Sequence, residues 1–166
     1  MLRHTGRLIT VLAVTTTFAL ADSAPVFAAD QVPFKGHYAG VLDPPHGPPP
    51  ERLTGSGNAT HLGASTNSGQ GRITGPANRC SDGFAVQNDE VLTSTDDGDQ
   101  VRITTFTEDC PVSPGVFEAI GTFTVTGGTG RFAGASGGGN ITGTPDLSQG
   151  TFEFSFDGRI SRPKGG

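Results

Sequence analysis

Apolar side chains recur at every second residue along much of this chain, and this period restricts the fold more than any other feature. Near the C-terminus, Phe152, Phe154 and Phe156 alternate with Glu153 and Ser155. The same alternation recurs at Phe117, Ala119, Phe123 and Val125. A strand with one apolar and one polar face is typical of an antiparallel sheet with solvent on one side. No stretch after residue 30 has a clear helical period, so the chain is expected to be all-β.

Eight strands are predicted, near residues 34–42, 51–60, 62–74, 83–95, 99–108, 116–126, 131–143 and 150–161. Eight consecutive antiparallel strands without a helix predict a closed β-barrel, because closure removes exposed strand edges. The interior of such a barrel is filled by side chains or holds one small ligand. Asp97 and Gly98 fit a two-residue hairpin turn. The proline-rich residues 43–50 predict a semi-rigid loop, because proline lacks the backbone donor that a strand needs.

Residues 1–28 have the pattern of a secretory signal peptide, with a basic start and small residues before the cleavage position. Their mostly apolar part, residues 8–21, is short for a membrane span. We expect cleavage after Ala28, with Ala21 and Ala29 as alternative positions and a retained anchor as the alternative fate. Residues 29–166 would then form a single secreted barrel domain with a disordered C-terminal tail.

The charge of the chain argues against nucleic acid and anionic membrane as partners. Without residues 1–28 the chain has nine basic and fifteen acidic residues, a net charge near −6. Both partners require a basic surface. No cofactor is expected.

Cys80 and Cys110 are the two cysteines, and an even count in an exported chain predicts one disulfide. They lie before the fourth predicted strand and after the fifth. If these strands form a hairpin, the bond would close its base. A catalytic or metal-binding role is the alternative, but no CxxC spacing is present and no metal site is expected.

Residues 125–130, Val-Thr-Gly-Gly-Thr-Gly, look like the glycine loop of a nucleotide-binding fold. That fold requires a helix directly after the loop, to hold the phosphates at its N-terminus. The following residues, Phe-Ala-Gly-Ala-Ser-Gly-Gly-Gly, are poor helix formers, and Arg131 and Phe132 stand where an ATPase loop needs Lys and Ser or Thr. The segment therefore predicts two strands joined by a tight turn.

Residues 127–135, Gly-Gly-Thr-Gly-Arg-Phe-Ala-Gly-Ala, resemble the turn motif of the allene oxide cyclase barrel and dirigent-like superfamily. Residues 59–63, Ala-Thr-His-Leu-Gly, are similar to a segment of its secreted bacterial branch. The resemblance implies a calycin-like eight-stranded barrel, a homotrimer by analogy with plant members, and cyclisation or coupling of hydrophobic molecules. No catalytic residue of the plant members matches a position here.

His37, His61 and Glu118 are the catalytic candidates that the sequence offers. His37 and Tyr38 are neighbours on the first strand, so one of them faces the interior. Glu118 would gain a raised pKa if it faced inward, but Phe117 and Phe123 claim the apolar face. His46 in the proline loop is expected to be solvated, as are the acidic pairs 96–97 and 108–109.

The aromatic residues are eleven Phe, one Tyr and no Trp, which indicates an apolar interior. Tyr38, Phe123 and Phe154 are the candidates for contact with a small hydrophobic ligand. Three hypotheses follow: a secreted barrel that binds such a ligand or is otherwise non-catalytic, a cyclase or isomerase, and a cell-surface structural or interaction module.

Overall fold

The structure is a computed structural model that describes residues 30–43 and 51–165. The predicted signal peptide, its cleavage after Ala28, and the proline loop with His46 lie outside the described residues. The described chain forms eight strands and one short 3-10 turn: β1 (Gln31–Asp43), β2 (Glu51–Ala59), β3 (Gly63–Pro76), β4 (Phe84–Ser94), β5 (Gln100–Ser113), β6 (Val116–Gly128), η1 (Gly130–Phe132), β7 (Gly137–Asp146) and β8 (Thr151–Ser161).

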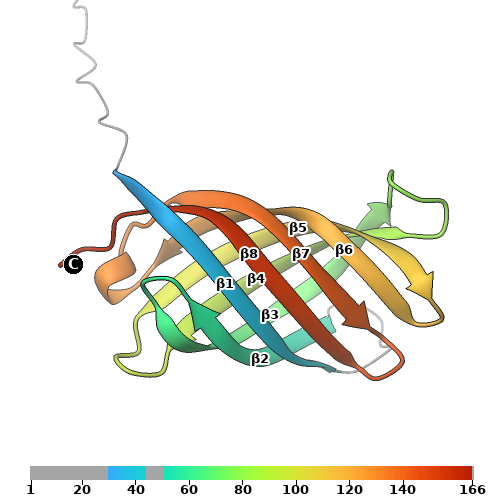
Figure 1. The fold of residues 1–166 in the computed structure, drawn as a ribbon, viewed down its shortest axis with the longest axis horizontal. Helices are drawn as coiled ribbons and strands as arrows, with labels where there is room; N and C mark the ends of the chain where they lie inside the picture. Colours follow the sequence, from blue (N-terminus) through green and yellow to red (C-terminus); the bar gives the residue numbers. More distant parts are fainter. Residues whose placement is uncertain (1–29, 44–50, 166) are drawn as a thin grey trace, which may run out of the picture.

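The strands form a closed antiparallel barrel, as the alternation predicts (Figure 1). Each strand pairs with the next, and β8 returns to pair with β1 from Gln31↔Ser161 to Val41↔Thr151. The closing pair therefore runs nearly the whole length of both strands. Among the residues described, no helix has the length and apolar character needed to cross a membrane.

The core lies inside the barrel. The aromatic residues on alternate positions of β8 are buried, which confirms the predicted apolar face. Phe123 packs against Phe34 and Phe156 with ring centroids 6.0 and 5.5 Å apart, and Tyr38 packs edge-on against Phe156 at 5.9 Å. Such tilted and edge-on contacts are favourable geometries for aromatic pairs.

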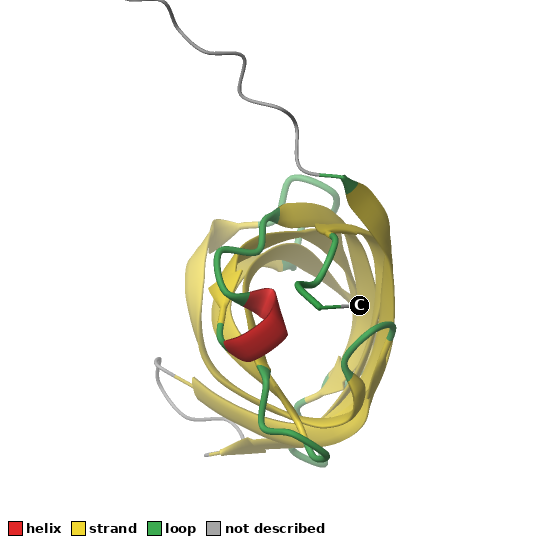
Figure 2. Cartoon of the chain, turned by 90° about the vertical axis from the view of Figure 1, so that its left-hand side faces the viewer, coloured by secondary structure: helices red, strands yellow, loops and turns green. Residues whose placement is uncertain are grey.

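The end of the barrel where β1 begins and β8 finishes is closed by the glycine-rich segment, and here the sequence prediction needs correction. The seventh strand was expected from residue 131, but β7 begins at Gly137 after η1 and a further turn. Gly130 and Gly134 have φ of 56° and 78°, values that favour glycine. The turn directs Phe132 into the core, where it is buried, and η1 lies within the barrel outline when this end is viewed (Figure 2). We call this the plugged end.

Arg131 links the η1 segment at the plugged end to the β4–β5 turn. Its guanidinium donates to Asp99 at 2.7 Å and to Asp97 at 2.6 Å. The prediction of a two-residue turn at Asp97–Gly98 is wrong. Residues 95–99 form a longer turn, in which the Ser94 N–H donates to the Asp99 carbonyl. Only Gly98 has a positive φ in this turn, and the Asp97 carboxylate accepts hydrogen bonds from the Asp99 N–H and from Arg131.

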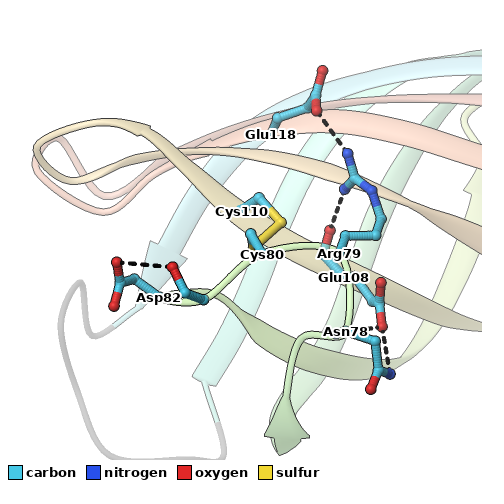
Figure 3. Close-up of a disulfide and its surroundings, with 8 residues drawn as sticks. Asn78, Arg79, Cys80, Asp82, Glu108, Cys110 and Glu118 are labelled. Carbon is cyan, nitrogen blue, oxygen red and sulfur yellow. Dashed lines mark hydrogen bonds and ion pairs between the residues drawn. A yellow bond between two sulfur atoms is a disulfide. The ribbon is translucent and has the colours of Figure 1, made fainter.

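The opposite end, which we call the mouth, is braced by a disulfide between Cys80 and Cys110. Cys80 lies in the β3–β4 loop and Cys110 near the end of β5, so the bond closes the base of the β4–β5 hairpin as predicted. Arg79, beside it, donates to the Glu108 carbonyl at 3.1 Å and to the Glu118 carboxylate at 2.9 Å (Figure 3). A disulfide is compatible with an extracellular protein.

After β8, the first residues of the predicted tail make backbone hydrogen bonds. Arg162 donates to the Asp30 carbonyl and Lys164 to the Arg131 carbonyl. The hydrogen bond from Lys164 joins the residues after β8 to η1 at the plugged end.

Replacement of both cysteines by serine should lower the free energy of unfolding by about 2–4 kcal/mol, because the bond closes a loop with a sequence separation of 30. Urea unfolding with and without reductant measures this. Reductant should shift the wild-type midpoint toward that of the double variant and leave the variant unchanged. Equal stability of oxidised wild type and variant would contradict the prediction.

Substitution R131A should lower the thermal unfolding midpoint, since the partly buried Asp99 carboxylate loses its charged donor. The matched control is R72A, whose 3.6 Å ion pair with Asp89 is exposed and should change stability by about 0.5 kcal/mol or less. Thermal unfolding followed by circular dichroism compares the two. Equal losses in both variants would refute the assigned role of Arg131.

Candidate functional site

Polar side chains occupy inward positions on three neighbouring strands, β3, β4 and β5. These buried polar residues are Ser65, Asn67, Asn88, Glu90, Ser94, Thr105, Thr107 and Asp109. Directly paired residues lie on the same face of a sheet. Asn88 pairs with Thr105 across β4 and β5, so the polar side chains form one continuous stripe inside the barrel.

Glu90 lies at the centre of this polar stripe and is 2% exposed. Asn67 donates from Nδ2 to Glu90 Oε2 at 2.8 Å, and the Thr105 hydroxyl donates to Oε1 at 3.4 Å. Asn88 in turn donates to Thr105 Oγ1 at 3.1 Å. Burial raises the pKa of Glu90 to about 7, although the bonds from Asn67 and Thr105 favour its ionised form. The carboxyl therefore changes charge near neutral pH.

Tyr38 joins the polar stripe to the aromatic core. Its hydroxyl lies 2.6 Å from Ser65 Oγ, and its ring packs against Phe156. Burial raises the pKa of Tyr38 to about 12, so the phenol stays neutral. The polar end of this buried aromatic residue is thus satisfied by the polar stripe.

A cavity of about 340 Å3 opens at the mouth. Its wall is mainly apolar, from Leu42, Leu53, Ile73, Phe84, Val86, Pro145, Leu147 and Phe154, with Gly71 among the lining residues. The polar stripe reaches this cavity through Asn88, Thr107 and Asp109. Glu51 and Arg72 complete the lining.

Asp109 is the buried carboxyl of the cavity wall, at 5% exposed. Burial raises its pKa to about 6, while a hydrogen bond from the Thr107 side chain and the positive charge of Arg79 act in the opposite direction. Its Oδ1 has no hydrogen-bond partner among the described residues. A buried acceptor without a partner is uncommon and has an energetic cost.

The structure does not bring the three catalytic candidates together. His37 is exposed on the outer face of β1, with Nδ1 3.2 Å from Ser155 Oγ and Nε2 3.3 Å from Glu153. Glu118 is exposed on the outer face of β6 and bonds Arg79. His61 occupies the β2–β3 turn with φ of 67°, where it borders a small hollow with Arg131 at the plugged end.

The three ligand-contact candidates are all inside the barrel, at different depths. Tyr38 and Phe123 belong to the packed core. Phe154 lines the mouth cavity and stacks on Phe152 with ring centroids 5.2 Å apart. Of the three, Phe154 is therefore placed to touch a ligand in this cavity.

Asp109 and Glu90 are the residues that the sequence reasoning missed. Asp109 was expected to be a solvated partner of Glu108, but adjacent residues of a strand point to opposite faces. Both acids were detectable by position: Glu90 is two residues from Leu92, and Asp109 continues the even spacing from Val101 and Ile103. An acid in register with apolar residues indicates an inward carboxyl.

No protein-family model, curated protein or solved structure matches this chain. Within residues 30–43 and 51–165, no three His, Cys, Asp or Glu side chains lie close enough together to hold a metal ion. The site is therefore interpreted from its own geometry.

Substitution E90Q should stabilise the protein at alkaline pH. Glu90 binds its proton more tightly in the folded chain, at a pKa of about 7, than at its ordinary value of 4.5. The contribution of this group to stability is therefore highest below about pH 4.5 and falls until the pH passes about 7. At about pH 8, E90Q should exceed wild type by roughly 1–3 kcal/mol in free energy of unfolding, because an uncharged amide replaces a buried carboxylate.

Urea unfolding of both proteins between about pH 4 and pH 8 measures the difference between them, which should shrink as the pH falls. The matched control is E153Q, at an exposed position on the outer face of β8, which should show no such gain. If the difference between E90Q and wild type did not change with pH, the assigned titration of Glu90 would be wrong.

Proposed function

We propose that the protein binds a small hydrophobic molecule in the mouth cavity. The observation that carries the proposal is the cavity itself, about 340 Å3 with a mainly apolar wall inside a closed barrel. Ligand pockets are typically about 300–1,000 Å3 and combine apolar walls with a few polar groups. Asn88, Thr107 and Asp109 are polar groups of that kind.

The wall of the cavity is braced before any ligand arrives. The disulfide at Cys110 follows Asp109 directly, and Arg79 fastens the β3–β4 loop to β5 and β6. A preorganised wall loses less conformational entropy when a ligand binds. This bracing supports binding as the function of the mouth.

We also propose that the protein acts outside the cell. The support is the disulfide together with the signal-peptide pattern of residues 1–28. An apolar ligand is poorly soluble in water, and an exported barrel would shield it there.

A cyclase or isomerase is the second candidate, and Asp109 is the observation that favours it. A carboxyl with a pKa raised to about 6 at a cavity wall can give or take a proton at a bound molecule. His37 and Glu118 give this candidate no support, because both lie on the outer face. Turnover of a cavity-bound unsaturated substrate that D109N abolishes would establish this activity, whereas unchanged ligand after prolonged incubation favours simple binding.

The neutral fluorescent probe N-phenyl-1-naphthylamine should bind the wild-type protein, with fluorescence that saturates at one probe per chain. Substitution V86W should weaken this binding at least about tenfold, because the inward side chain of Val86 lines the cavity and an indole would fill it. The matched control is V41W on the outer face of β1, which should bind the probe as wild type does.

Thermal unfolding of both variants checks that they fold. Absence of saturable binding to wild type, or equal binding by wild type and a folded V86W, would overturn the proposed function.

A further inference from the structure

The polar end of the mouth cavity contains a buried carboxyl group, that of Asp109, which needs an explanation beyond the volume and apolar wall of the cavity. Asp109 is more than nine-tenths buried, lines the cavity, and keeps one carboxyl oxygen without a partner among the described residues. Its backbone position is paired with Phe84 on β4 and Ala119 on β6, inside the closed sheet. A neighbouring strand therefore has no free backbone N–H to offer this oxygen.

The two arginines near the mouth, Arg72 and Arg79, bind acceptors other than the Asp109 carboxylate. Arg72 lines the cavity, but its guanidinium is 3.6 Å from Asp89, an exposed residue of the outer face. Arg79 donates to the Glu108 carbonyl and to Glu118, also on the outside. The positive charge of Arg79 lowers the pKa of Asp109, but neither guanidinium lies within hydrogen-bonding distance of its carboxyl group. Among the described residues, this carboxyl therefore has no charged donor.

The remaining lining determines what kind of donor would fit. Glu51 is a second acidic residue of the wall, and Arg72 is the one basic residue among those described. A carboxylate or phosphate ligand would meet like charge at Asp109. A polyol would leave most of its hydroxyls against apolar side chains, at a cost for each unpaired group.

We propose that the mouth cavity binds a small apolar molecule that carries a protonated amine, with the ammonium group against Asp109 and the hydrocarbon part against Leu53, Val86 and Phe154. The inference rests on the proposed binding function and assigns its ligand class. The ammonium group supplies a positive charge and N–H donors at the Asp109 carboxylate, and hydrogen bonds between two ionised groups are stronger than neutral ones. Burial raises the pKa of Asp109 to about 6, so the carboxyl is ionised above that pH.

Isothermal titration calorimetry at about pH 7.5 with n-octylamine, 1-octanol and octanoate tests the assignment, because the three share one hydrocarbon chain. Octylamine should bind wild type at least about tenfold more tightly than octanol, and octanoate more weakly than octanol. In D109N, octylamine should lose its preference over octanol, so that the two affinities agree to within about twofold. The matched control is D157N, at an exposed carboxylate of β8 that pairs with Lys35 and does not line the cavity, which should keep the preference for the amine.

The possible results distinguish failure of the proposed ligand class from failure of the proposed binding function. If N-phenyl-1-naphthylamine binds but octanol or octanoate equals octylamine, the ligand class is overturned and the binding function stands. If folded D109N keeps the preference for octylamine, Asp109 is not the recognition group and the inference fails. If neither octylamine nor the fluorescent probe binds wild type, both proposals fail. The comparison of three ligands on wild type holds even if D109N does not fold.

Discussion

The pairing of β1 with β8 is the interaction on which the rest of the structure depends. It turns an open sheet into a barrel and satisfies the two edges that would otherwise expose unpaired backbone groups. Once the sheet is closed, every inward side chain is enclosed by its own neighbours, and solvent and ligands reach it only through the ends. The two ends therefore decide what the interior can do: Phe132 fills one, and the cavity occupies the other.

The interior is divided lengthwise between two chemical environments. Aromatic side chains from β1, β6 and β8 pack together and supply most of the apolar core. The polar stripe on β3, β4 and β5 supplies less hydrophobic stabilisation and includes Glu90, whose burial opposes its ionisation. Asn67, Thr105 and Asn88 offset part of this cost at Glu90, whereas Asp109 keeps an oxygen unpartnered beside the cavity. Buried polar groups that lack a partner break a general rule of protein stability, and such exceptions are expected at functional sites.

The fold was largely predictable because its signal is local. Alternation along single strands, as at Phe152, Phe154 and Phe156, indicated strands, and the lack of helical segments led to a barrel. The prediction failed where a tertiary contact overrides local preference. Phe132 lies in a turn that buries its ring at the barrel end, where a continued strand was predicted, and Asp97 lies in a longer turn where its carboxylate accepts from Arg131 and from the Asp99 N–H. The acidic pair Glu108–Asp109 predicts a solvated Asp109, but strand geometry places the two side chains on opposite faces, and Asp109 is buried.

By itself, the sequence determined the strand periodicity, the all-β class, the number of strands and the disulfide, because each depends on residue type and short-range spacing. Only the tertiary structure decided where the cavity lies and which carboxyls face it. Those properties depend on register between strands and on closure, which bring together Leu53, Phe84, Asp109 and Phe154 from four different strands. A one-residue change in register would exchange the inward and outward faces of a strand. The chemistry of the mouth is therefore a consequence of pairing, which no single segment of the chain encodes.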